Sequence, residues 1–92
     1  MSDFRVFETD QFQEDLGKIF GARGGKITAK LQTLVYPQLR QQPYFGKNIR
    51  KLKGYSPETW RYRIGAYRFF YEIGDKDKIV FMVAAALRAR SY

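Results

Sequence analysis

The chain has 92 residues, enough for one domain built on a single hydrophobic core. It contains no cysteine and no histidine, which excludes disulfides, thiolate metal sites and catalysis by either side chain. Any metal site would need carboxylates alone, and we expect no cofactor. The formal net charge is +8 and uneven: residues 1–46 hold six Lys/Arg and five Asp/Glu, whereas residues 47–92 hold eleven and four. A basic second half indicates nucleic acid, an anionic membrane or an acidic protein as partner.

No targeting or membrane segment is evident in the sequence. No apolar run approaches the roughly 18 residues of a membrane-spanning helix, and the charged N-terminus does not resemble a signal peptide. The chain also shows no internal repeat, linker or low-complexity stretch. We therefore expect a cytoplasmic protein that folds as one domain over residues 1–92.

The first half of the chain predicts one strand and two helices. Residues 4–9 alternate like a strand, and Thr9 or Asp10 then caps a helix. A glycine-rich break separates it from a second helix, which Pro37 is expected to kink or end. The two helices form an antiparallel hairpin. Their apolar stripes are predicted to lie in the core and comprise Phe12, Leu16, Ile19, Phe20, Ile27, Leu31, Leu34 and Val35, with Leu39 as an extension.

The second half predicts strands. Residues 48–53 are a candidate strand, although Ile49 and Leu52 are too close in phase to fix its register. Residues 59–73 predict a β-hairpin, and residues 78–84 a final strand. The order of strand, two helices and four strands predicts an α+β fold. Its helices pack on one face of a mostly antiparallel, four- to five-stranded sheet.

The hairpin is the stretch around which the rest of the chain is organised. Glycine at the first position of Gly65-Ala66 suits a two-residue type II′ turn. This turn fixes the register and places Arg63 opposite Arg68. Arg61 then faces Phe70. Because side chains alternate along a strand, one face carries residues suited to the core, namely Trp60, Tyr62, Ile64, Tyr67, Phe69 and Tyr71.

The opposite face of the hairpin is basic. It carries Arg61, Arg63 and Arg68 beside Phe70 and Glu72. Like charges directly opposite each other destabilise a sheet, whereas guanidinium groups bind phosphate oxygens in bidentate fashion. The patch therefore indicates a polyanionic ligand. The alternative is a solvated sheet face that Glu72 partly neutralises.

The segment before the hairpin is crowded with basic residues, namely Lys47, Arg50, Lys51 and Lys53. Lys47, Lys51 and Lys53 are candidates for sequence-independent contacts to a nucleic-acid backbone. Alternatively, they protect the edge of the sheet from aggregation. Phe70 lies among the arginines and is a candidate for contact with an RNA base.

This pattern resembles the RelE/ParE superfamily of bacterial toxins from type II toxin–antitoxin pairs. The likeness covers nearly the whole chain and is most specific in Leu52-Lys53-Gly54, residues 60–73 and residues 88–92. The resemblance implies a cognate antitoxin and a hetero-oligomer with it. The superfamily holds two activities: RelE-like members cleave mRNA in the ribosomal A site, whereas ParE-like members poison DNA gyrase.

The resemblance also implies site residues, because catalysis in the RelE branch is attributed to basic hairpin residues and to a C-terminal arginine and tyrosine. The matching positions are Arg61, Arg63, Arg68, Arg88 and Tyr92. In this reading the arginines hold the phosphate and stabilise the transition state. Tyr92 takes part in proton transfer or stacks on a base, and Glu72 is a rival general base.

The activity expected from this resemblance is metal-independent, ribosome-dependent cleavage of mRNA. Two departures favour the alternative, a ParE-like gyrase inhibitor without nuclease activity. Arg61 and Arg63 stand where well-studied RelE members carry lysine, and the closing segment reads Ala86-Leu87-Arg88 where Gly-His-Arg is common. The sequence therefore leaves both activities open and favours the nuclease.

Overall fold

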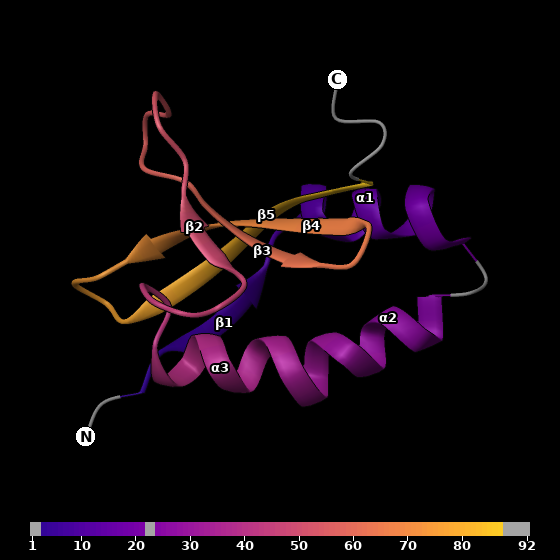
Figure 1. Ribbon diagram of the computed structural model, residues 1–92, viewed down its shortest axis with the longest axis horizontal. Helices are drawn as coiled ribbons and strands as arrows, with labels where there is room; N and C mark the ends of the chain where they lie inside the picture. The colour runs from indigo at the N-terminus through magenta and orange to yellow at the C-terminus, as the bar shows by residue number, and fades with distance from the viewer. Residues whose placement is uncertain (1–2, 22–23, 88–92) are drawn as a thin grey trace.

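The computed structural model of the protein describes residues 3–21 and 24–87. Its sheet has five strands in the order β1-β5-β4-β3-β2 (Figure 1). Only β1 and β5 pair in parallel, and the other neighbours are antiparallel. The strands are β1 (Arg5–Glu8), β2 (Ile49–Lys51), β3 (Trp60–Ile64), β4 (Tyr67–Gly74) and β5 (Ile79–Leu87). The predicted α+β class, with a mostly antiparallel sheet, is confirmed.

Helices cover one face of this sheet. They are α1 (Asp10–Phe20), α2 (Gly24–Lys30) and α3 (Tyr36–Gln41). Thr9 is the cap of α1, because its hydroxyl oxygen accepts a hydrogen bond from the backbone N–H of Phe12 at 3.2 Å. Figure 1 shows α2 and α3 as one long rod along the side of the sheet. In the described ranges, no helix has the length and apolar character needed to cross a bilayer.

Of the two outcomes expected at Pro37, a kink or an end of the second helix, the end does not occur. The chain stays helical to Gln41, with a π-helical turn at Leu31–Val35 inserted between α2 and α3. In this turn the Tyr36 N–H donates to the carbonyl of Leu31. Pro37 follows directly, and the wider turn gives its ring room beside the preceding carbonyls. The helix therefore accommodates the proline through a π-helical turn and continues beyond it.

Leu34 was predicted to lie in the core, and this is also wrong, since 49% of its surface is exposed. The buried stripe of the long helix runs at four-residue spacing and adds Tyr36, which the sequence pattern had not included. Its members are Ile27, Leu31, Val35, Tyr36 and Leu39. Leu34 lies outside this stripe, and its side chain is therefore exposed to solvent.

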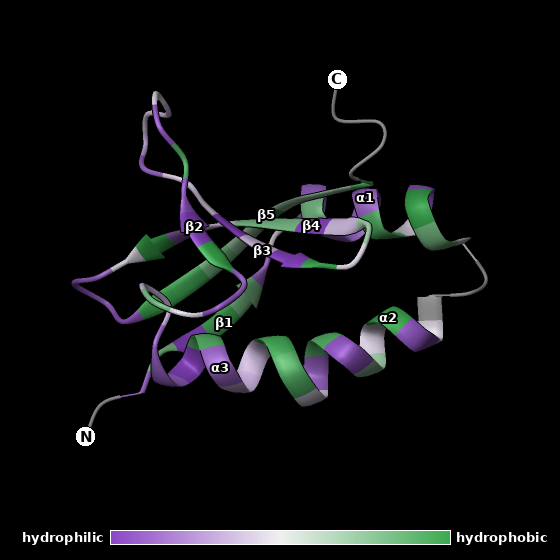
Figure 2. Ribbon diagram, in the orientation of Figure 1, coloured by the Kyte–Doolittle hydropathy of each residue, from purple (hydrophilic) through white to green (hydrophobic). Residues whose placement is uncertain are grey.

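The hairpin register is as predicted. Arg63 pairs with Arg68 and Arg61 with Phe70, and Gly65 has a positive φ of 55° at the turn. The predicted core face of the hairpin packs against the helices: Tyr62, Phe69 and Tyr71 are fully buried, and Trp60, Ile64 and Tyr67 are packed at the margin. Figure 2 shows that β3 and β4 carry both hydrophilic and hydrophobic residues.

The last strand is longer than predicted. β5 continues past Ala84 to Leu87, because β4 offers it a partner along its whole length. A β-bulge lies in β5, where Phe70 pairs with Ala84 but Tyr71 pairs with Met82, so that one residue of β5 is left over. The bulge places Ala85 in the core.

The second strand is shorter than predicted. β2 spans only Ile49–Lys51, and a turn begins directly after it. Ile49 pairs with Tyr62, and Arg50 pairs with Arg61. This register, which the sequence pattern left open, decides which side chains of β2 join the basic side of the sheet.

Candidate functional site

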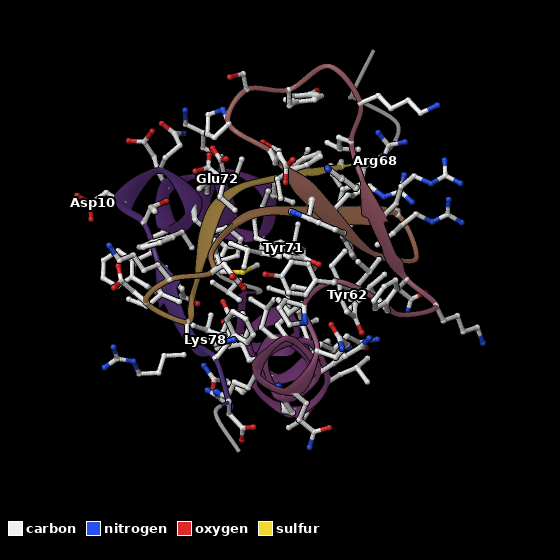
Figure 3. All side chains as sticks on the ribbon, turned by 90° about the vertical axis from the view of Figure 1, so that its left-hand side faces the viewer. Asp10, Tyr62, Arg68, Tyr71, Glu72 and Lys78 are labelled. Atoms are coloured by element: carbon white, nitrogen blue, oxygen red, sulfur yellow. The ribbon has the colours of Figure 1, made fainter. Side chains whose placement is uncertain are left out.

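Four arginines lie on the face of the sheet that the helices leave uncovered. Arg61, Arg63 and Arg68 come from the hairpin, and Arg50 joins them because it pairs with Arg61. We call these four residues the basic face. In Figure 3, Tyr62 and Tyr71 point towards the helix at the bottom of the view, whereas Arg68 lies on the other side of the sheet.

Arg50 is the site residue that sequence reasoning missed. To place Arg50, one must know whether the odd- or the even-numbered residues of β2 face the core, because alternate residues of a strand share a face. The sequence does not decide this, because Ile49 and Leu52 are both apolar but would lie on opposite faces of a strand. The pairing of Ile49 with the buried Tyr62 settles it, and Arg50 then faces away from the core.

The basic face is compact. Neighbouring strands lie about 4.8 Å apart and residues two positions apart on a strand are separated by about 7 Å. Arg63 and Arg68 are directly opposite each other, and all three hairpin arginines are half-buried. The Nε atoms of Arg61 and Arg68 are buried. The cationic groups are therefore held at the sheet surface, where their mutual repulsion favours a bound anion.

The neighbouring strand, β5, places small side chains beside the residues of the basic side of β4. Ala86 pairs with Arg68 and Ala84 pairs with Phe70. Phe70 is half-buried and shares the face with the arginines, as predicted from the alternation. Arg88 and Tyr92 lie outside the described residues, so their predicted roles remain predictions.

Glu72 lies on the same face as Arg68, four residues further along β4, and pairs with Phe81. It is half-buried. The face therefore has arginines at the Gly65 end of the hairpin and a carboxylate towards the other end. Glu72 is the carboxylate that β4 contributes to this face.

The three lysines do not share one environment. Lys51 pairs with Trp60 and so belongs to the opposite face from Arg50. Its ammonium group is 3.0 Å from a carboxylate oxygen of Glu58 and 5.9 Å from the centre of the Trp60 ring. Lys47 and Lys53 are exposed in the turns before and after β2. They flank the basic face rather than belonging to it.

Buried tyrosines fix the hairpin against the helical layer. The Tyr62 hydroxyl donates to the side-chain oxygen of Gln38 at 2.9 Å, and the Tyr71 hydroxyl donates to the carbonyl of Pro43 at 2.7 Å. Burial raises the pKa of Tyr71 above its usual value, so this phenol stays protonated. These hydrogen bonds hold the strands that carry the arginines against the rest of the fold.

Helices packed on one face of a mostly antiparallel, five-stranded sheet are the fold that the resemblance to the RelE/ParE superfamily implied. The family model described as "ParE toxin of type II toxin-antitoxin system, parDE" matches residues 6–92. The protein therefore belongs to the ParE toxin family of type II toxin–antitoxin systems.

Solved structures show the same fold. The toxin–antitoxin complex RelBE2 from Mycobacterium tuberculosis aligns with a TM-score of 0.74 at 24% identity, covering 97% of this chain and 95% of that one. The archaeal RelE–RelB complex from Pyrococcus horikoshii aligns at 0.65 with 24% identity, covering 97% and 99%. A mutant of E. coli toxin RelE in the free state also aligns at 0.65, with 19% identity over 99% and 88%. None of the curated proteins matches the sequence significantly.

Proposed function

We propose that this toxin cleaves mRNA on the ribosome and thereby inhibits translation. The observation that carries the proposal is the basic face, where four arginines from three strands gather on the uncovered side of the sheet. Arginine side chains in this arrangement suit a phosphodiester, because each planar fork binds two phosphate oxygens. A surface that only contacted a protein would not need like charges placed directly opposite each other.

The proposed chemistry uses the RNA itself as nucleophile. The 2′-hydroxyl loses its proton and attacks the adjacent phosphorus, the bond to the 5′-oxygen breaks, and that oxygen takes up a proton. Arg61, Arg63 and Arg68 stabilise the negative charge that builds up on the phosphoryl oxygens. Arginine remains protonated in proteins, so it cannot act as the base. Glu72 and Tyr92 are the proposed proton acceptors.

Dependence on the ribosome follows from this composition. Without histidine the site lacks a side chain whose ordinary pKa lies near neutrality. Rate enhancement must then come largely from orienting the 2′-hydroxyl in line with the scissile bond, which a bound ribosome provides for its mRNA. We therefore expect cleavage of mRNA held in the A site and little cleavage of free RNA.

Primer extension on a defined mRNA programmed into ribosomes tests the proposal, with ribosomes omitted as the first control. Wild type should produce cuts at the A-site codon. Arg68→Ala should reduce the cleavage rate about 100-fold or more, the usual effect of losing one donor to a transition-state oxyanion. Lys76→Ala removes the same charge from the exposed turn before β5 and should cleave like wild type. Intact mRNA at high wild-type concentration would refute the nuclease.

Inhibition of DNA gyrase is the second candidate, favoured by the match to the ParE family model. In this case the basic face is a protein-binding or DNA-proximal surface and no bond in RNA is broken. A supercoiling assay with purified gyrase distinguishes the two. Loss of supercoiling together with intact mRNA on ribosomes assigns the protein to gyrase, and the reverse pattern assigns it to mRNA.

A cognate antitoxin is proposed as the physiological partner. The chain carries a net charge of +8, most of it in the second half, and no helix within residues 3–21 and 24–87 covers the basic face. An antitoxin with acidic residues at the contact would neutralise this face and block it, with a helix or an added strand as its means of contact. Co-expression with the acidic partner should abolish the activity measured above.

A further inference from the structure

Residues 52–59, between β2 and β3, carry an exposed aromatic side chain that the basic face does not use. Tyr55 lies in the middle of this segment with 58% of its surface exposed. Its hydroxyl has no hydrogen-bonding partner among the described residues. In Figure 1 the segment stands away from the sheet on the side opposite α3.

The base of this segment is held in place. The Leu52 N–H donates to the carbonyl of Thr59 at 2.9 Å, and the Thr59 hydroxyl donates to the carbonyl of Pro57 at 3.1 Å. The ion pair between Lys51 and Glu58 joins its two ends at 3.0 Å. A loop tied in this way presents Tyr55 with less conformational freedom than an open loop of the same length.

A hollow of about 450 Å³ lies at the loop, within the range of small-ligand sites. Its lining combines an aromatic ring, a carboxylate and two ammonium groups, and consists of Lys51, Leu52, Lys53, Gly54, Tyr55 and Glu58. An aromatic face suits any nucleobase, and lysine suits the phosphates that flank it. Lys51 is already paired with Glu58, so a purely apolar peptide would leave the ammonium group of Lys53 without a partner.

The hollow is adjacent to the basic face. Arg50 belongs to the basic face, whereas Lys51, the next residue of β2, belongs to the opposite face and lines the hollow. Because β2 is an edge strand of the sheet, a single strand whose phosphate lies on the arginines reaches the hollow by passing over this edge.

From these observations we infer that residues 52–59 form a nucleotide-binding subsite, in which a nucleobase of single-stranded RNA stacks on Tyr55 while Lys53 contacts the neighbouring phosphate. This rests on the proposed function, since the RNA is the one held on the basic face. The subsite binds a nucleotide that flanks the scissile phosphate and takes no part in bond breaking.

Two measurements test the subsite, the rate of mRNA cleavage on ribosomes and the affinity of the full chain for a labelled single-stranded RNA measured by fluorescence anisotropy. Tyr55→Ala should lower both by about ten- to a hundredfold, the range found for losing one base–aromatic stack. Tyr55→Phe should recover most of the loss because the ring is retained. Phe45→Ala is the matched control: Phe45 is 74% exposed in a different loop.

RNA in which single nucleotides lack a base separates stacking from charge. One such substitution should weaken binding by the wild type but not by Tyr55→Ala, because the variant has already lost the stack. Lys53→Ala should weaken binding of intact and abasic RNA equally. Circular dichroism and thermal unfolding of each variant exclude loss of folding as the cause.

The outcomes separate the subsite from the proposed function. If the wild type cuts no mRNA, the nuclease proposal fails, and the anisotropy measurement still decides the subsite. Tyr55→Ala that binds RNA like wild type overturns the inference. Tyr55→Ala that binds RNA normally but no longer binds the antitoxin also overturns it and identifies the loop as a protein contact.

Discussion

At the scale of single residues, Asp15 compensates for the different lengths of two strands. β1 ends at Glu8, which pairs with Met82, so the rest of β5 has no strand neighbour on that side among the described residues. The carboxylate of Asp15, on α1, accepts a hydrogen bond from the N–H of Ala85 at 3.0 Å. Ala85 is buried, and without Asp15 its N–H would lack this acceptor.

Asp15→Ala should therefore lower the free energy of unfolding by about 1–3 kcal/mol, the range for leaving a buried donor unsatisfied. Asp15→Asn retains an acceptor oxygen and should lose less. Glu14→Ala is the matched control, because Glu14 is exposed and makes only a 3.8 Å ion pair with Lys18. Urea denaturation measures all three, and equal losses for Asp15→Ala and Glu14→Ala would show that the bond to Ala85 contributes little.

At the scale of elements, two glycines play opposite parts. Gly65 has a φ of 55° at the turn of the hairpin, a backbone region that side chains with a Cβ avoid. Gly17 lies inside α1, is exposed and has nothing within 4 Å of the position where a Cβ would stand. The first glycine serves the turn, whereas the second only weakens its helix.

The same substitution should therefore act in opposite directions. Gly65→Ala should destabilise the protein by about 1–2 kcal/mol, and Gly17→Ala should stabilise it by about 0.5–1 kcal/mol. The midpoint of urea unfolding measures both. A stabilising Gly65→Ala would contradict the type II′ turn, and a destabilising Gly17→Ala would indicate that the bare surface of α1 at this position contacts another part of the chain.

At the scale of the whole molecule, tyrosine hydroxyl groups connect the layers. Tyr36 on α3 donates to the Glu8 carboxylate of β1, and Tyr44 donates to Asp75 at 2.6 Å. Burial, followed by the bond to Glu8, raises the pKa of Tyr36. Partial burial, followed by the bond to Asp75, raises the pKa of Tyr44 to about 12, and burial raises that of Tyr71.

These shifts predict alkaline instability. Each of the three phenols keeps its proton in the folded protein above the pH, about 10, at which it is lost in the unfolded chain. The unfolded chain then binds fewer protons, so the free energy of unfolding falls as the pH rises from about 10 towards 12. Urea unfolding at several pH values in this range measures how steeply the free energy of unfolding falls with pH. Tyr44→Phe and Tyr71→Phe should each make this slope shallower, and an unchanged slope in both variants would contradict the assignment.

The uncovered face is also a property of the whole molecule. In residues 3–21 and 24–87, the helices pack on one side of the sheet, and the net charge of +8 includes the four arginines on the other side. This uneven charge attracts polyanions at long range. The affinity for a nucleic acid should fall as the salt concentration rises, because binding releases counterions from the nucleic acid.

The sequence by itself determined the hairpin and the order of the elements. Gly65-Ala66 fixes a two-residue turn, and alternation from that point assigns every side chain of β3 and β4 to a face. The three hairpin arginines and the buried tyrosines could be placed without coordinates for this reason. The information was local, since a turn and a period of two are properties of neighbouring residues.

Only the tertiary structure decided what depends on distant partners. The length and bulge of β5 come from pairing with β4, because its run of alanines has low strand propensity of its own. Arg50 joins the basic face because Tyr62 selects the register of β2. The helix continues through Pro37 because Leu39 beyond it is buried against the core, and packing outweighs the local preference of a proline to end a helix.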